Sequence, residues 1–148
     1  MSPRLPTAQQ LAQRLIDRER IAGDADMTRA STAALAGEEL YQALSRWIGT
    51  DGCHALFTRA RAQAQGDHPP LVALQFRARA EPYIEGVAES VGKYGETATA
   101  DAIESMLVGM IELLGRLIGV DMATNLIERS LPESARGDAG PEKRRAKA

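Results

Sequence analysis

Apolar residues recur every three to four positions along most of the chain, which is the spacing of amphipathic helices. A first helix is expected to begin after Thr7, a suitable N-cap, and to end near Ala22. Its apolar stripe is narrow, and the glycine and aspartates of residues 23–26 then interrupt the pattern. We interpret this N-terminal piece as separable from the rest, either a docking arm or a loosely packed helix.

The next apolar period predicts a second helix from about Thr32 to Ile48. Its apolar positions are Leu35, Leu40, Tyr41, Leu44, Trp47 and Ile48. Gly49 suits the left-handed position just beyond a helix end, and Asp51 suits the N-cap of a following helix. That third helix is expected over 52–65, and the Pro-rich turn after it ends the helix.

A fourth helical stretch is predicted over 71–94, where Pro82 either kinks one long helix or begins a new one. Three acidic residues recur at intervals of four on one face of this predicted helix, namely Glu81, Glu85 and Glu89. The row is interpreted either as a solvated face or as an acidic strip that binds a basic partner. No segment shows the alternation of a β-strand.

The fifth predicted helix begins after Thr97 or Thr99 and runs to about Ile118. Apolar residues cover well over half of its circumference, so it must be central or covered by a partner. A last helix is expected to end near Leu131. The chain is therefore predicted to be all-α, a compact bundle of about five to six helices. We divide it into an N-terminal helix and linker (1–31), the bundle core (32–131) and a disordered basic tail (132–148).

Two segments of the chain resemble each other at an offset of seventy residues. Residues 44–59 read LSRWIGTDGCHALFTR and residues 114–129 read LGRLIGVDMATNLIER, with seven of sixteen positions identical. Each segment contains a helix end, a Gly-x-Asp turn and the start of another helix. This pattern predicts an internal duplication with a pseudo-two-fold arrangement of the paired helices.

Composition and charge exclude several classes of function. The formal net charge is −2, and residues 81–129 carry nine acids against three bases, so binding of nucleic acid is not expected. A single cysteine, Cys53, excludes an internal disulfide and a multi-cysteine zinc site. The apolar stretch 103–120 contains three charged residues, which favours a buried helix over a membrane span. With no secretory signal in the sequence, a cytoplasmic location is expected.

The candidates for chemistry are few. Cys53 and His54 are neighbours in sequence, but neighbours on a helix point about 100° apart and do not face each other. His54 could accept a phosphoryl group, although Phe57 and Thr58 stand where phosphotransfer bundles favour a small residue. The carboxylates lack histidines at metal-binding spacing, and no phosphate-binding glycine loop occurs. No catalytic residue, cofactor or metal is therefore predicted.

The leading hypothesis is a non-enzymatic cytoplasmic regulatory or adaptor protein that acts through protein–protein contacts, as a homodimer. The alternative is a small-molecule-sensing helical domain whose ligand lies between the two repeat halves. The residues expected around that ligand are Trp47, Phe57, Met106 and Met110. A further alternative is histidine phosphotransfer through His54.

Overall fold

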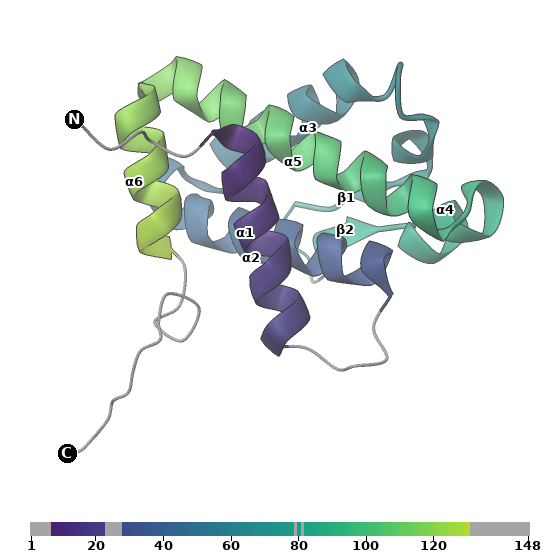
Figure 1. The fold of residues 1–148 in the computed structure, drawn as a ribbon. Helices are drawn as coiled ribbons and strands as arrows, with labels where there is room; N and C mark the ends of the chain where they lie inside the picture. Colours follow the sequence, from purple (N-terminus) through teal and green to yellow (C-terminus); the bar gives the residue numbers. More distant parts are fainter. Residues whose placement is uncertain (1–6, 23–27, 79, 81, 131–148) are drawn as a thin grey trace.

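The computed structural model describes residues 7–22, 28–78, 80 and 82–130. Within these residues the chain forms a bundle of six α-helices with one 3₁₀ helix and one short two-stranded sheet, which confirms the all-α prediction (Figure 1). In chain order the elements are α1 (Ala8–Ala22), α2 (Arg29–Ile48), α3 (Thr50–Ala64), η1 (Pro69–Ala73), β1 (Gln75–Phe76), β2 (Ile84–Glu85), α4 (Val87–Tyr94), α5 (Glu96–Ile118) and α6 (Val120–Ser130). The predicted tail lies outside the described residues.

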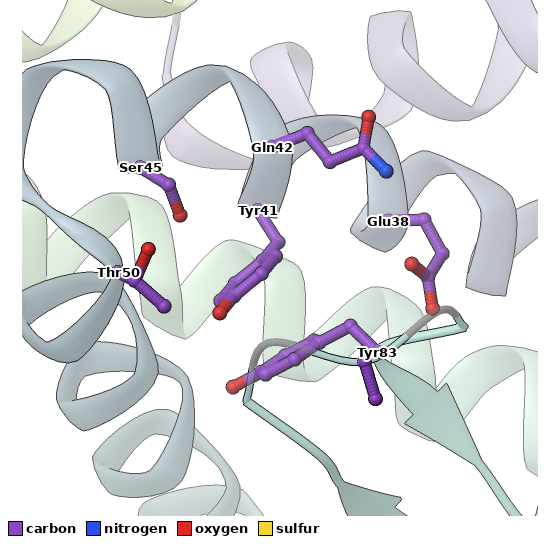
Figure 2. Close-up of a pocket in the computed structure, with 7 residues that line it drawn as sticks. Glu38, Tyr41, Gln42, Ser45, Thr50 and Tyr83 are labelled. Atoms are coloured by element: carbon purple, nitrogen blue, oxygen red, sulfur yellow. The ribbon is translucent and has the colours of Figure 1, made fainter.

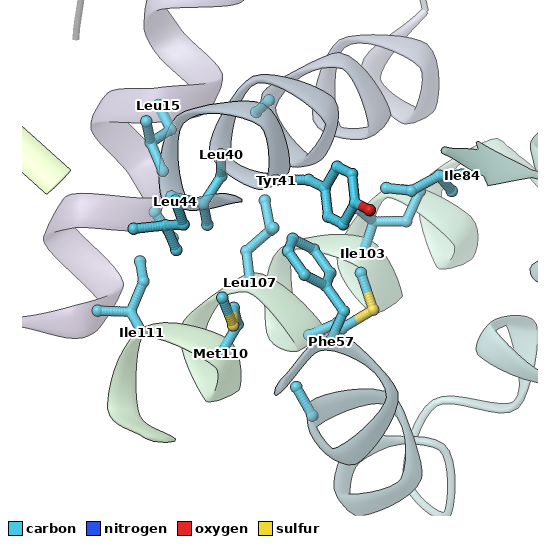
Figure 3. Packing of buried hydrophobic residues seen from close by; sticks show 14 of the residues in the cluster. Leu15, Leu40, Tyr41, Leu44, Phe57, Ile84, Ile103, Leu107, Met110 and Ile111 are labelled. Atoms are coloured by element: carbon cyan, nitrogen blue, oxygen red, sulfur yellow. The ribbon is translucent and has the colours of Figure 1, made fainter. Parts of the chain in front are cut away.

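Helix α5 is the centre of the bundle, as its apolar circumference predicted. It contacts α1, α2, α3, α4 and α6 and crosses the middle of the molecule (Figure 1). Met106, Leu107 and Met110 of α5 are completely buried in the core cluster. Figure 3 shows Leu107 and Met110 among side chains from the surrounding helices. A helix that is apolar on most sides is stable in water only when neighbours cover those sides, and here five helices do so.

Helix α1 is held at both its cap and its apolar face. The Thr7 hydroxyl accepts a hydrogen bond from the Gln10 amide at 3.1 Å, and the Gln10 side chain accepts one from the Thr7 amide at 2.9 Å. This reciprocal pair satisfies two donors at the helix start. Leu11 and Leu15 are buried in the same cluster as residues of α2 and α5. Helix α1 is therefore a packed part of the bundle and not a loose arm.

The two segments that resemble each other form two corners with the same backbone shape. Gly49 (φ 87°, ψ 155°) joins α2 to α3, and Gly119 (φ 96°, ψ 146°) joins α5 to α6. Only glycine adopts this conformation readily, because a Cβ atom would clash with the backbone. Residues 40–49 and 110–119 also have the same pattern of buried and exposed positions.

The helices of the two corners pack crosswise. Helix α3 of the first corner contacts α5, α6 of the second corner contacts α2, and α2 and α5 contact each other. A third helix–helix joint, at Gly95, has nearly the same conformation (φ 101°, ψ 159°) although its sequence is unrelated. This backbone shape therefore does not require a duplication, and the duplication stays a prediction.

The prediction of a helical stretch over 71–94 is wrong, except for its last eight residues in α4. The chain there forms η1 and then a hairpin in which Phe76 of β1 pairs with Ile84 of β2. Pro82 neither kinks nor begins a helix but lies just before β2. The hairpin is fixed by contacts with α2 and α3, so the local apolar spacing, which also fits a helix, did not reveal it.

Candidate functional site

Four of the six aromatic residues meet where the hairpin rests on α2 and α3. The Tyr83 ring lies between Tyr41 of α2, at 3.6 Å between ring centroids, and Phe76 of β1, at 5.2 Å. Phe57 of α3 presents its face or edge at a steep angle to all three rings. These edge-to-face and stacked contacts hold the hairpin against the bundle.

Polar contacts fix the same hairpin from both sides. The backbone amide of Ile84 donates to the Glu38 carboxylate of α2 at 2.6 Å. The Arg61 guanidinium of α3 donates to the Leu74 carbonyl at 2.8 Å and lies over the Phe76 ring, 4.7 Å from its centroid. The position of Tyr83 is therefore set by both α2 and α3.

The hydroxyl groups of the two stacked tyrosines differ in their partners. The Tyr83 hydroxyl lies 2.8 Å from Nδ1 of His54 on α3, and burial raises the pKa of Tyr83, so the phenol stays neutral. Tyr41 is only 7% exposed, and its hydroxyl forms no hydrogen bond with a described residue. Of the two tyrosine hydroxyls, that of Tyr83 is therefore satisfied and that of Tyr41 is not.

These side chains border an open cleft of about 500 Å³ at the first corner, between α2, the start of α3 and the hairpin (Figure 2). The lining residues are Glu38, Tyr41, Gln42, Ser45, Thr50, Ala80 and Tyr83. We call this space the polar cleft.

A second hollow, of about 530 Å³, lies at the other corner between α1, α5 and α6. It is lined mainly by apolar side chains, and we call it the apolar hollow. Its lining residues are Thr7, Ala8, Leu11, Ile111, Glu112, Gly115, Arg116, Val120, Ala123 and Thr124. Three large apolar residues of this corner are exposed, Leu117 by 65%, Val120 by 58% and Met122 by 55%, and Val120 among them lines the hollow.

The polar cleft and the apolar hollow occupy equivalent places. Residues 41, 42, 45 and 50 line the first, and residues 111, 112, 115 and 120 line the second, again at an offset of seventy. The hairpin borders the polar cleft, whereas α1 borders the apolar hollow. The sequence comparison contained this correspondence, but only the fold shows that each repeat segment borders a hollow.

Cys53 and His54 face different partners, as the helix geometry predicted. Cys53 is fully buried and its thiol lies 3.6 Å from the Tyr41 carbonyl. Burial raises the pKa of Cys53 to about 11, against a smaller lowering effect of the Ser45 hydroxyl, so the thiol is protonated at neutral pH. His54 is half-buried, and its Nδ1 is engaged by Tyr83.

The residues predicted to surround a ligand are not brought together around a space. Phe57, Met106 and Met110 are fully buried in the core cluster (Figure 3). Trp47 is 57% exposed and lies at the surface, like its counterpart Leu117. The period of α2 placed Trp47 on the apolar face, but of the two apolar residues in the last turn only Ile48 packs, in part, against the core.

The predicted acidic row is also wrong as a helical feature. Glu85 belongs to β2, where it forms an ion pair with Arg77 at 3.0 Å, and Glu89 belongs to α4. Glu81 lies outside the described residues. A row at intervals of four requires one continuous helix, which the hairpin replaces.

Two general features of the described residues bear on chemistry. Their His, Cys, Asp and Glu side chains form no group of three or more that could hold a metal ion. None of their helices combines the length and apolar content needed to cross a bilayer.

The described residues define a small helical bundle with two hollows at equivalent positions, the first with mixed polar and apolar lining and the second lined mainly by apolar side chains. Comparisons with protein-family models, with curated proteins and with solved structures find no match. The geometry of the two hollows is therefore the basis for the function proposed below.

Proposed function

We propose that this chain is a non-enzymatic regulatory or adaptor protein that acts through protein–protein contacts, and that it forms a homodimer through the corner between α5 and α6. The observation that supports this proposal is the exposure of Leu117, Val120 and Met122 within six consecutive positions of this corner, where Val120 lines the apolar hollow. A cytoplasmic location, predicted from the sequence, is part of the proposal.

Exposed apolar side chains at this density favour an interface. Burying one Val, Leu or Met side chain is worth about 1.5–3 kcal/mol relative to leaving it in water. Single exposed apolar residues are common on protein surfaces, whereas a cluster beside a hollow is typical of interaction sites. Helices α1, α5 and α6 bury their other large apolar residues against one another and against the core. Among the described residues of these three helices, the exposed apolar side chains are therefore concentrated at the corner between α5 and α6.

Charge at the rim favours a second copy of this chain as the occupant. Glu112 and Arg116 both line the apolar hollow, are exposed, and lie one turn apart on α5. A two-fold axis between two antiparallel copies of this helix end would place Glu112 of one copy opposite Arg116 of the other. The same operation would bring the protruding Val120 toward the partner's hollow.

The test is the mass of the full-length, untagged protein by native mass spectrometry, with sedimentation velocity as a second measure. We expect a dimer that Val120→Asp weakens by tenfold or more in Kd, which corresponds to about 1.4 kcal/mol or more. Val72→Asp is the matched control, because Val72 is similarly exposed, at 65% against 58% for Val120, but lies in η1.

A charge exchange tests the geometry of the dimer. Glu112→Arg alone would oppose two arginines and weaken the dimer, and adding Arg116→Glu would restore it. A wild-type protein that stays monomeric at all concentrations, or a dimer equally weakened by Val72→Asp, would contradict the proposal.

A further inference from the structure

The polar groups of the polar cleft are sorted along its length. One face of α2 supplies most of them, at spacings i, i+3, i+4 and i+7 from Glu38, Tyr41, Gln42 and Ser45. This face extends over two helical turns, or about 10 Å. The hydroxyls of Tyr41 and Tyr83 point toward the end where Ser45 and Thr50 lie, and the Glu38 carboxylate lies at the other end (Figure 2).

The hydroxyl end of the cleft contains the unsatisfied Tyr41 hydroxyl. A buried hydroxyl without a hydrogen bond is costly, because folding removes its bonds to water and replaces them with nothing. The Tyr83 hydroxyl beside it already bonds to His54 at 2.8 Å. The Tyr41 hydroxyl lies just below the surface of the cleft, so a ligand hydroxyl reaches it only if the side chains around it move slightly. The ligand hydroxyl could then both accept from and donate to Tyr41, and so would supply the bond that the fold leaves out.

The other end carries a negative charge. Among the described residues that line the cleft, Glu38 alone is charged. One of its oxygens accepts the Ile84 amide at 2.6 Å, but a carboxylate has about four acceptor positions and can accept further donors. An anionic ligand would meet this carboxylate without a compensating cation, whereas an ammonium group would form a charge-assisted hydrogen bond with it.

We propose that the polar cleft binds a small organic amine that also carries a hydroxyl group, with the ammonium at Glu38 and the hydroxyl at Tyr41. The volume of about 500 Å³ is within the range of small-molecule sites. The ligand therefore contacts the first corner and the hairpin together, and its binding is independent of the surface proposed for dimerisation.

In the experiment, aminopentanol that carries its amino group at one end and its hydroxyl group at the other is added to the full-length protein labelled for NMR. Its matched controls are pentanediol, which lacks the cation, and hydroxypentanoate, which carries an anion instead. We expect aminopentanol to shift the amide signals of Ile84 and Thr50 and to bind about tenfold or more tightly than hydroxypentanoate, with pentanediol between them.

Two substitutions separate binding from folding. Tyr41→Phe and Glu38→Gln each remove one predicted ligand contact, and the glutamine retains an acceptor for the Ile84 amide. We expect each to weaken aminopentanol binding by about tenfold. Tyr94→Phe is the control, since Tyr94 lies on α4 and does not line the cleft. Without ligand, Tyr41→Phe should leave the melting temperature unchanged or raise it, because no hydrogen bond is lost.

Several results would overturn this inference. They are an absence of shifts at cleft amides, equal binding of aminopentanol and hydroxypentanoate, or binding that both substitutions leave unchanged. A lower melting temperature of Tyr41→Phe without ligand would also do so, because it would mean that the hydroxyl has a partner within the protein.

Discussion

The two corners of this bundle have the same backbone and opposite surfaces. At the first corner Ser45 and Thr50 border a polar cleft, and at the second the equivalent Gly115 and Val120 border an apolar hollow. The corners also differ in what lies across from them, since the hairpin faces the first and α1 faces the second. A common helix–glycine–helix shape thus supports two different kinds of recognition.

The comparison shows which residues set the shape and which set the chemistry. Leu44 and Leu114 are both fully buried, and Gly49 and Gly119 have nearly the same backbone conformation. Each leucine therefore packs in the core beneath its corner, and each glycine forms the turn between the two helices. The residues around them are free to differ, because a change at the rim of a hollow alters its polarity without disturbing the packing beneath it.

The largest effect is expected from the buried leucines. Leu44→Ala and Leu114→Ala should each lower the free energy of unfolding by about 2–5 kcal/mol, because each leaves a cavity in a core that other helices close. Chemical denaturation measures both values, with Val72→Ala as an exposed control of small effect. If Leu44→Ala and Leu114→Ala lowered the free energy of unfolding by very different amounts, the two corners would not be equivalent.

A smaller effect is expected from the corner glycines. Gly49→Ala and Gly119→Ala should each cost about 1–3 kcal/mol, because a side chain is strained at these positive φ angles. Open space surrounds both positions, so the loss would come from backbone strain and not from a collision. Gly92→Ala, within helix α4, should instead stabilise the protein slightly. Tolerance of alanine at either corner, measured by thermal unfolding, would show that the corner can change shape.

The smallest effect concerns a difference between the corners that appears only at alkaline pH. Cys53 has a pKa of about 11 against an ordinary value of 9.0, and the equivalent residue, Ala123, does not titrate. The folded protein therefore keeps a proton that the unfolded chain releases, so stability is lost as pH rises from about 9 toward 11. Cys53→Ala should make this decline shallower, as followed by denaturation at several pH values. An identical decline in wild type and variant would assign it to other groups, such as Tyr83.

The helices of the bundle were largely predictable because their signals are local. The period of α5 and the stop at Gly119 indicate a central helix and its end, and the structure places that end at Ile118. Thr7 was recognisable as a cap from its position alone. The ends of α2 and α3 were predicted to within three residues, which is the usual precision of such boundaries.

The hairpin and the exposure of Trp47 could not be predicted in the same way. Strands of two residues carry almost no periodic signal, and Ile84 and Val87 fit a helical face equally well. The clue that remained was the pair of aromatic residues, Phe76 and Tyr83, which lie on either side of Pro82. Trp47 is exposed although the next residue, Ile48, packs partly against the core, and this difference depends on where the other helices lie.

The sequence by itself determined the helices, the glycine corners and the resemblance between the two corner segments. These features depend on residues within a few turns of one another, and local geometry decides them. Only the tertiary structure decided that the hairpin stacks Tyr83 on Tyr41, that the two corners border hollows, and that these hollows differ in polarity. Those features join residues thirty or more positions apart, and packing of the whole bundle is required to bring them together.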